Sequence, residues 1–269
     1  MNFCIDVYSG IEYEELLPMI SHLGFDGFFS REDYANDYNK ISMCRSLADA
    51  NNLLYETMHS TIPGDTTIWL DTPEGDEYIK TLLLCVDNCA AFHIPTMIVH
   101  VAAYMNQHVS FERGVKRLKK VVDYAYKKGV RIAFENVGAS EFLFNTMDYF
   151  REEHVGFCYD TGHNFVCCPD IDVLGTLGHR LVCTHIHDND GEVDQHLIPF
   201  DGKIDFESIC EKLNHFDYKG NLTLEIYYKG SHDERYEKFC GPYANRYSKS
   251  EFLQRCKDSL VKLKGMLEE

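Results

Sequence analysis

Residues 110–136, SFERGVKRLKKVVDYAYKKGVRIAFEN, contain a complete helix signal followed at once by a strand signal. Ser110 is a residue type that caps helix N-termini, and Glu112 places a carboxylate in the first turn. Lysines gather at the end of the periodic segment, just before Gly129, a typical helix stop. The run 130–135 is short and apolar, as expected of a buried strand. This stretch therefore predicts an α-helix that leads directly into a β-strand.

The same alternation of strand-like and helical segments recurs along the chain. Strands are predicted at 2–7, 25–29, 53–58, 96–101, 130–135, 155–159, 181–187 and 221–227. Helices are predicted at 11–23, 39–51, 75–92, 111–128, 143–152, 170–178, 205–215 and 249–267. Eight such units with right-handed crossovers predict an α/β fold, a (β/α)8 TIM barrel. No linker or composition shift divides residues 1–269, so we expect a single domain.

Composition and charge argue against several classes of protein. Hydrophobic residues make up 45% of the chain and charged residues 26%, which is typical of a globular protein with a sizeable core. No apolar run approaches the roughly 18 to 20 residues of a membrane span, and the start does not resemble a signal peptide. We therefore expect a cytoplasmic protein without a membrane partner, whose 11 cysteines are reduced thiols. A formal net charge of −17 argues against nucleic acid as a partner.

Histidines and carboxylates gather where the predicted strands end. From the third strand onward nearly every strand end carries one, and the residues are His59, His100, Glu135, Asp160, His163, His185, His187 and Glu225. A parallel barrel brings the C-terminal ends of its strands to one rim, where the active site lies. Charges buried behind apolar runs are costly unless a cation compensates them. The pattern therefore predicts a metal site at this rim.

The donor types narrow the choice of ion. Carboxylates together with histidines suit Zn²⁺, Mn²⁺, Co²⁺ or Mg²⁺, and the cysteines are not placed for a zinc–sulfur site. The stretch 184–196, THIHDNDGEVDQH, does not fit a calcium loop. An EF-hand needs glycine at its sixth position, whereas counting from Asp188 puts Gly191 fourth. The cofactor is thus expected to be a divalent metal ion that the sequence does not distinguish further.

Several short motifs together resemble one known group of proteins. They are FEN at 134–136, DTGH at 160–163, HIHD at 185–188, DQHL at 194–197 leading into DGKIDF at 201–206, and YKG at 218–220 before Leu224 and Glu225. In this order the set resembles the xylose isomerase-like TIM barrels. That group includes sugar-phosphate isomerases and epimerases and the family 2 AP endonucleases of the endonuclease IV type. The resemblance covers most of the chain and is strongest from 130 to 227.

The resemblance implies a ligand set and a reaction. Glu135, Asp160, His185 and Glu225 match the four ligands that hold one divalent metal across the group. In the epimerase branch, Glu135 and Glu225 also match the catalytic carboxylates that exchange a proton with the carbon next to the substrate carbonyl.

The remaining polar residues of the rim have more than one interpretation. Substrate contacts are predicted for His163, His187 and Lys203, although Lys203 could instead pair with Asp201. In the endonuclease branch, which uses three zinc ions, additional ligands match His59, His100, His163, Asp194 and His196. The predicted number of ions is therefore one, with up to three possible.

We expect a divalent-metal-dependent sugar or sugar-phosphate isomerase or epimerase acting on a small carbohydrate or polyol, with a homo-oligomer as one possible assembly. The loops 8–13 and 30–34 are acidic and depart from the endonuclease pattern. An endonuclease IV-like zinc phosphodiesterase is nevertheless an alternative, as are a polyol dehydratase or lyase and a non-catalytic barrel. Loops 60–75, 102–109 and 228–248 would select the substrate, and Trp69 in the first of them either packs in the core or stacks on a sugar ring.

Overall fold

The computed structural model describes residues 1–62, 64–101, 109–138, 140–229 and 243–268. Most of the predicted substrate loops 102–109 and 228–248 therefore lies outside the described residues. The chain forms two compact units: unit 1 comprises Met1–Phe28, Ser46–Leu54 and Tyr159–Glu269, and unit 2 comprises Phe29–Arg45 and Tyr55–Cys158. That residues 1–269 form a single domain stays a prediction.

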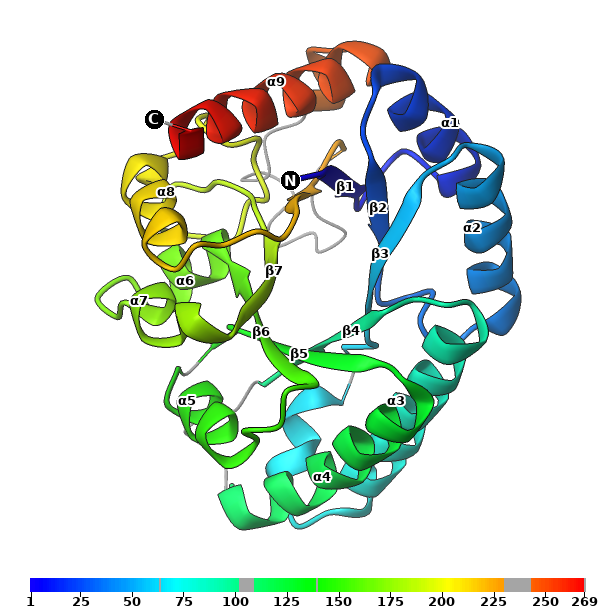
Figure 1. Ribbon diagram of the computed structural model, residues 1–269, viewed down its shortest axis with the longest axis vertical. Helices are drawn as coiled ribbons and strands as arrows, with labels where there is room; N and C mark the ends of the chain where they lie inside the picture. The colour runs from blue at the N-terminus through cyan, green and yellow to red at the C-terminus, as the bar shows by residue number, and fades with distance from the viewer. Residues whose placement is uncertain (63, 102–108, 139, 230–242, 269) are drawn as a thin grey trace. The chain divides into compact units, whose positions relative to one another are not determined.

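Strands and helices alternate along the described chain (Figure 1). The strands are β1 (Phe3–Val7), β2 (Gly27–Ser30), β3 (Leu54–His59), β4 (Thr96–His100), β5 (Arg131–Glu135), β6 (Val155–Asp160), β7 (Leu181–His185) and β8 (Leu222–Ile226). The helices are α1 (Tyr13–Leu23), α2 (Tyr38–Ala50), α3 (Pro73–Ala91), α4 (Phe111–Lys128), α5 (Ser140–Tyr149), α6 (Thr161–Cys167), α7 (Val173–Leu177), α8 (Phe206–His215) and α9 (Lys249–Glu268). Short 3-10 helices are η1 (Asp65–Trp69), η2 (Gly178–Arg180) and η3 (Tyr243–Asn245).

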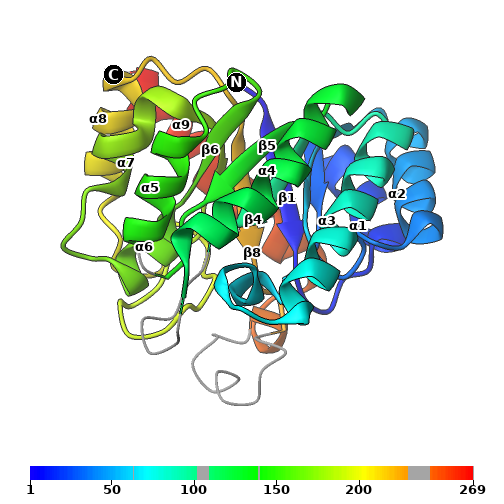
Figure 2. The same ribbon diagram turned by 90° about the horizontal axis from the view of Figure 1, so that it is seen from below.

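Helix α4 forms where the sequence predicts it. The Ser110 side chain accepts a hydrogen bond from the backbone N–H of Arg113, and Gly129 ends the helix at φ 72°, a left-handed conformation that glycine adopts without strain. The buried face, which includes Leu118 and Val122, repeats at three-to-four spacing. In unit 2, α4 packs against α3 (Figure 2). Helix α4 also contacts β5, and α3 contacts β4.

The strands of unit 1 pair in parallel. Strand β1 pairs with β8 from Phe3 opposite Leu222 to Val7 opposite Ile226, and it also pairs with β2 at Cys4. Just after β7, Ile186 forms a parallel bridge with Leu224 of β8. Helix α9 packs against both α1 and α8 in this unit (Figure 1).

In unit 2, β3, β4 and β5 form parallel ladders, and β5 continues the series with the first residues of β6. The order along the sheet is β7-β6-β5-β4-β3-β2-β1-β8. Neighbours in sequence are thus neighbours in the sheet, and the Ile186–Leu224 bridge joins the two strands that end this order. The fold is the predicted (β/α)8 TIM barrel.

Two helix predictions need correction. The helix expected at 143–152 begins three residues earlier, as α5. The segment expected as a single helix at 170–178 holds only the short α7 and η2, while the preceding α6 was not predicted. Helix α6 begins directly after β6 because the Asp160 carboxylate caps it, accepting from the N–H of His163 at 2.6 Å.

Two expectations from composition concern the whole chain. Among the described residues, no helix is both long and apolar enough to cross a membrane. The described cysteines are free thiols, most of them buried in the core, as expected for reduced residues that pack as small hydrophobes. The cytoplasmic location stays a prediction.

Candidate metal centre

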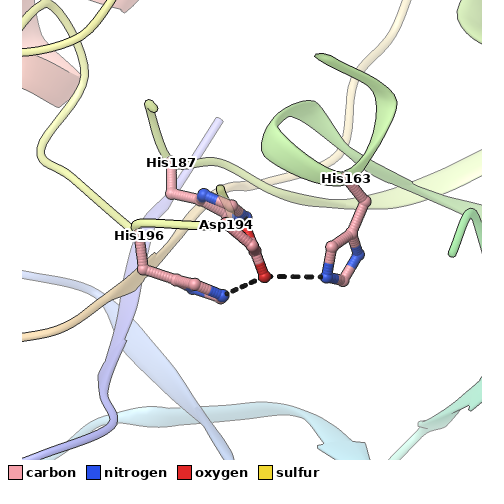
Figure 3. Close-up of side chains that lie close together, drawn as sticks. All are labelled: His163, His187, Asp194 and His196. Atoms are coloured by element: carbon pink, nitrogen blue, oxygen red, sulfur yellow. Dashed lines mark hydrogen bonds and ion pairs between the residues drawn. The ribbon is translucent and has the colours of Figure 1, made fainter. Parts of the chain in front are cut away.

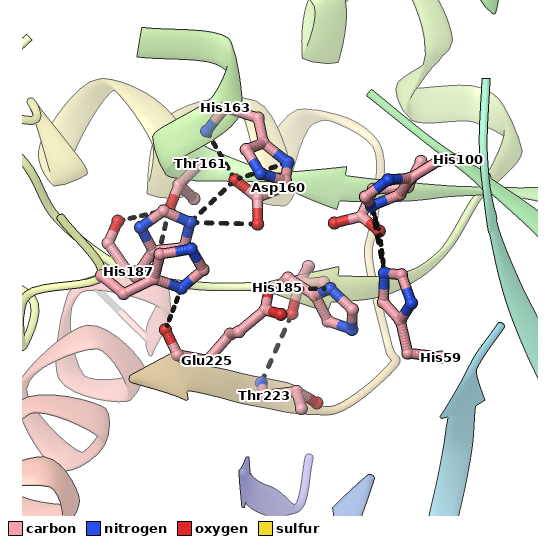
Figure 4. Close-up of polar contacts among 12 residues, drawn as sticks. His59, His100, Asp160, Thr161, His163, His185, His187, Thr223 and Glu225 are labelled. Carbon is pink, nitrogen blue, oxygen red and sulfur yellow. Dashed lines mark hydrogen bonds and ion pairs between the residues drawn. The ribbon is translucent and has the colours of Figure 1, made fainter. Parts of the chain in front are cut away.

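Three of the four residues that the family resemblance implies as ligands of one metal ion lie in unit 1, at or near the ends of strands. Asp160 ends β6, His185 ends β7, and Glu225 is the penultimate residue of β8. Their exposed fractions are 0%, 1% and 4%, so all three are buried. His185 Nδ1 lies 3.1 Å from Glu225 Oε2 (Figure 4). Two buried carboxylates, Asp160 and Glu225, are costly without a compensating positive charge, which is consistent with a metal site.

Asp160 serves the local fold as well as the site. One of its oxygens caps α6, while His187 Nε2 lies 3.1 Å from both carboxylate oxygens (Figure 4). The backbone of His187 is fixed by Thr161, whose hydroxyl donates to the His187 carbonyl at 2.6 Å and accepts from its N–H at 3.0 Å. The first turn of α6 and the end of the β7 segment are therefore locked together around this carboxylate.

A second group in unit 1 gathers His163, His187, Asp194 and His196 (Figure 3). One ligand atom from each residue lies within 4.8 Å of the others. Asp194 Oδ2 lies 3.0 Å from His196 Nε2 and 3.4 Å from His163 Nε2, and Asp194 Oδ1 lies 3.7 Å from His187 Nε2. The rings of His187 and His196 stack, with centroids 3.9 Å apart. We call these four residues the loop cluster.

Charges within the loop cluster shift two pKa values. Burial favours the neutral form of His196, but the Asp194 carboxylate outweighs it and raises the pKa of His196 to about 9. Burial likewise opposes the charge of Asp194, yet His196 and His163 hold its pKa well below the usual range. The cluster thus favours a carboxylate surrounded by groups that can carry or receive positive charge.

The loop that carries Asp194 and His196 is organised by Asp188, a fully buried residue. Its Oδ1 accepts from the N–H groups of Asn189 (2.8 Å) and Ile204 (3.0 Å). Its Oδ2 accepts from Phe200 and Gly202, each at 2.9 Å. A side chain at Gly202 would collide with this carboxylate. Asp188 therefore gathers both ends of the loop around one charge.

Unit 2 brings together His59, His100 and Glu135, which end β3, β4 and β5. The two histidine Nε2 atoms lie 3.0 Å apart, and Glu135 Oε2 lies 3.2 Å and 3.3 Å from them. His59 Nδ1 lies 2.8 Å from the Ser60 carbonyl, and His100 Nδ1 lies 3.6 Å from Asp65 (Figure 4 shows the two rings).

These contacts fit a metal site in unit 2. An Nδ1–H that faces a carbonyl or carboxylate leaves the Nε2 lone pair for an ion, as in most histidine metal ligands. A divalent ion with bonds of about 2.0 to 2.2 Å separates neighbouring ligand atoms by roughly 3 to 3.5 Å. The spacing of 3.0 to 3.3 Å among the three ligand atoms agrees with this.

Three predictions from sequence concerned residues beside the ligands. Trp69 is fully buried and stacks on Phe111, so it belongs to the core and not to a sugar-stacking surface. Asp201 pairs with Arg255 at 3.1 Å and accepts from the Tyr243 hydroxyl at 2.8 Å, in place of the considered pair with Lys203. The Lys203 side chain is exposed, and its contact with a substrate phosphate stays a prediction.

The sequence did not predict His187 as part of a ligand group, nor Asp65 beside His100. The signal for His187 was its spacing of two from His185. Residues at this spacing share one face while the chain stays extended, so both rings turn inward at the end of β7. Asp65 had no comparable signal because it lies in η1, a turn of helix within a loop.

Comparisons with known proteins agree with this architecture. Protein y4fM of Sinorhizobium fredii is 31% identical over 154 residues, which is 52% of this chain and 50% of that protein. Protein MJ1311 of Methanocaldococcus jannaschii is 29% identical over 119 residues, 40% of this chain and 41% of that protein. The chain thus matches about half, or less, of the length of these relatives.

Solved structures resemble the chain over nearly its whole length. The D-psicose 3-epimerase of Clostridium cellulolyticum H10, solved with D-tagatose, has a TM-score of 0.80, 15% identity, and coverage of 99% of both chains. The IolI protein, solved with a zinc atom, has a TM-score of 0.76, 16% identity and 98% coverage of both chains. The 3-keto-D-glucoside 4-epimerase YcjR of E. coli has a TM-score of 0.72 at 17% identity, covering 98% of this chain and 99% of that one.

At these identities the structures establish the fold, and the neighbours named include sugar epimerases. A family model described as xylose isomerase-like TIM barrel matches residues 17–241. The motifs at the ends of β5 to β8 lie within that match. The chain therefore belongs to the xylose isomerase-like TIM barrel family.

Proposed function

We propose that this protein is a divalent-metal-dependent isomerase or epimerase of a sugar or sugar phosphate. The observation that carries the proposal is the set of buried carboxylates and histidine at the ends of the last four strands. Glu135 in unit 2 and Asp160, His185 and Glu225 in unit 1 are the proposed ligands of one ion. Each is at most 4% exposed, and a (β/α)8 barrel gathers such strand ends at its catalytic rim.

The donor set suits the proposed ion. Three carboxylates and one neutral imidazole carry a net charge of about −3, which a divalent cation largely offsets. The contact between His185 Nδ1 and Glu225 Oε2 keeps two of the donors together. Zn²⁺, Mn²⁺, Co²⁺ and Mg²⁺ all accept nitrogen and carboxylate ligands in such a site.

The proposed reaction moves a proton at the carbon next to a substrate carbonyl. A bound divalent cation would polarise that carbonyl and so acidify the neighbouring C–H bond. Glu135 and Glu225 would hold the ion and act as the general base and the general acid, because a carboxylate can accept a proton and donate it again. One of them removes the proton, and the other returns a proton to the opposite face of the carbon. Lys203, which is exposed, is the candidate contact for a substrate phosphate.

The experiment uses protein stripped with a chelator and reloaded separately with Mn²⁺, Zn²⁺, Co²⁺ or Mg²⁺. Ketoses, aldoses, inosose-type polyols and their phosphates are incubated with it in deuterated water and followed by NMR. We expect deuterium to enter at the carbon next to the carbonyl of at least one substrate. Glu135→Gln and Glu225→Gln should abolish this exchange, whereas Glu192→Gln, at an exposed position of the loop, should retain it. No exchange and no turnover with any compound and metal would refute the proposal.

A second candidate is a three-ion zinc phosphodiesterase of the endonuclease IV type. The observation that favours it is the presence of two further ligand groups, His59–His100–Glu135 in unit 2 and the loop cluster in unit 1. Three ions would activate water and stabilise the charge that develops at phosphorus. Three zinc ions per chain together with cleavage of an abasic DNA duplex would support it over the isomerase. A polyol that loses water in the NMR assay would instead identify a dehydratase on the same scaffold.

A further inference from the structure

The residues of the loop cluster lie close enough together to share one ion, since one ligand atom from each lies within 4.8 Å of the others. An ion with bonds of about 2.0 to 2.1 Å places the atoms of a tetrahedral set about 3.3 Å apart. Asp194 Oδ2 lies 3.0 Å from His196 and 3.4 Å from His163, and Asp194 Oδ1 lies 3.7 Å from His187. The four side chains point toward one another from α6, from the end of the β7 segment and from the following loop (Figure 3).

Two of the three rings are oriented by contacts outside the cluster. His196 Nδ1 lies 3.0 Å from the Glu225 carbonyl, so the N–H there leaves the Nε2 lone pair facing Asp194. The ring of His187 lies directly under Gly162, where a β-carbon would come within 1.9 Å of it. Space for this ring thus exists only because residue 162 is glycine.

The backbone at His196 supports a built site. Its φ of 48° lies in the left-handed region, which is unfavourable for a residue with a side chain. Such strain persists where the surrounding structure imposes it, often at functional sites. Here the strained conformation turns the imidazole toward Asp194 and His187.

We propose that His163, His187, Asp194 and His196 bind one zinc ion in a closed, four-coordinate structural site. The family resemblance implies three of these ligands, His163, Asp194 and His196, which would leave a position open for substrate or water. His187 fills that position. Structural zinc sites have four protein ligands, whereas catalytic sites keep one position open. The ion therefore fixes the loop between β7 and α8, and this role does not depend on the isomerase chemistry.

This assignment replaces the substrate contacts that the sequence predicted for His163 and His187. His187 also has a neighbour outside the cluster, because its Nε2 lies 3.1 Å from Asp160 and 3.7 Å from Asp194. We call the ion proposed for Glu135, Asp160, His185 and Glu225 the core ion, and the ion of the loop cluster the loop ion. If His187 only orients Asp160, its replacement should affect the core ion; if His187 is a ligand, its replacement should affect the loop ion. The metal content of variants distinguishes these two roles.

The test uses the full chain, with metal counted by mass spectrometry and the zinc replaced by Co²⁺ for visible absorption. The wild type should bind a loop ion with the intense absorption of four-coordinate cobalt. His187→Ala should weaken binding of this ion by at least about 10-fold, since even partners outside the coordination shell cost about 10- to 100-fold. His185→Ala, the matched control, should lose the core ion and retain the loop ion. Circular dichroism verifies that each variant folds.

Three outcomes would overturn the proposal. The first is that His163→Ala does not lower the metal content relative to the wild type. The second is that the cobalt bound at the loop cluster has a spectrum of five- or six-coordinate type. The third is a folded His187→Ala variant that keeps the loop ion or loses only the core ion. The wild-type spectrum decides the matter even when a variant does not fold. Absence of sugar turnover alongside a four-coordinate loop ion would refute the proposed function and leave this site standing.

Discussion

Asp188→Asn is expected to lower the free energy of unfolding by about 3 to 6 kcal/mol, because two hydrogen bonds to a charged acceptor are each worth about 1.5 to 3 kcal/mol. The carboxylate accepts two backbone N–H groups on each oxygen, and an amide keeps only one of these oxygens. Its NH₂ group would then face two other donors inside the protein. The loss is a large part of the ~5–15 kcal/mol that stabilises a typical domain.

Urea unfolding followed by circular dichroism measures this change, with metal removed from both proteins so that ion binding does not contribute. Asp190→Asn is the matched control. The backbone N–H groups of Glu192 and Val193 both donate to the same Asp190 oxygen, so an amide oxygen in that place can accept both hydrogen bonds. We expect the control to unfold within about 1 kcal/mol of the wild type. If Asp188→Asn behaved like the control, the argument that one buried carboxylate organises the loop would be wrong.

Other predictions concern the same region and the last helix. Gly162→Ala should destabilise the protein by about 1 to 3 kcal/mol because the new methyl group meets the His187 ring. Gly265→Ala, in α9 with no atom within 4 Å, should stabilise it by about 0.5 to 1 kcal/mol, and thermal unfolding measures both. In metal-free protein, the raised pKa of His196 adds stability that is complete below its unfolded pKa of about 6.5 and is lost as pH rises through about 9. A pH series of urea unfolding should therefore show this loss in the wild type and not in His196→Gln.

Strands were predicted closely because the local pattern and the fold agree. The runs at β4 and β5 are apolar on both faces, as parallel strands buried under helices must be, and their ends fall within two residues of the prediction. The positions of the proposed ligands Glu135 and His185 could be predicted for the same reason, since polar residues at the ends of such runs must lie at the rim of the barrel.

Loops were less predictable because their conformation depends on contacts between residues far apart in sequence. Helix α6 was not predicted for two reasons. Its N-cap residue, Asp160, was interpreted as a metal ligand, and its first turn contains Gly162, a poor helix former. The four hydrogen bonds to the Asp188 carboxylate come from residues up to 16 positions away in sequence. No local sequence pattern predicts such bonds. The position of Trp69 in the core likewise depends on Gly114, which provides space for the indole from another helix.

The distribution of thiols has a practical consequence for spectroscopy. Burial raises the pKa of Cys85 and of Cys210 to about 11, so these sulfurs are protonated and shielded from reagents at neutral pH. Among the described cysteines, Cys167 is the exposed one, and it ends the short helix whose first turn carries His163. Of the described cysteines, Cys167 is therefore the one that a maleimide fluorophore or spin label would reach, at the opposite end of α6 from the proposed ligand His163. Such a probe would report on binding of the proposed zinc ion without an added cysteine.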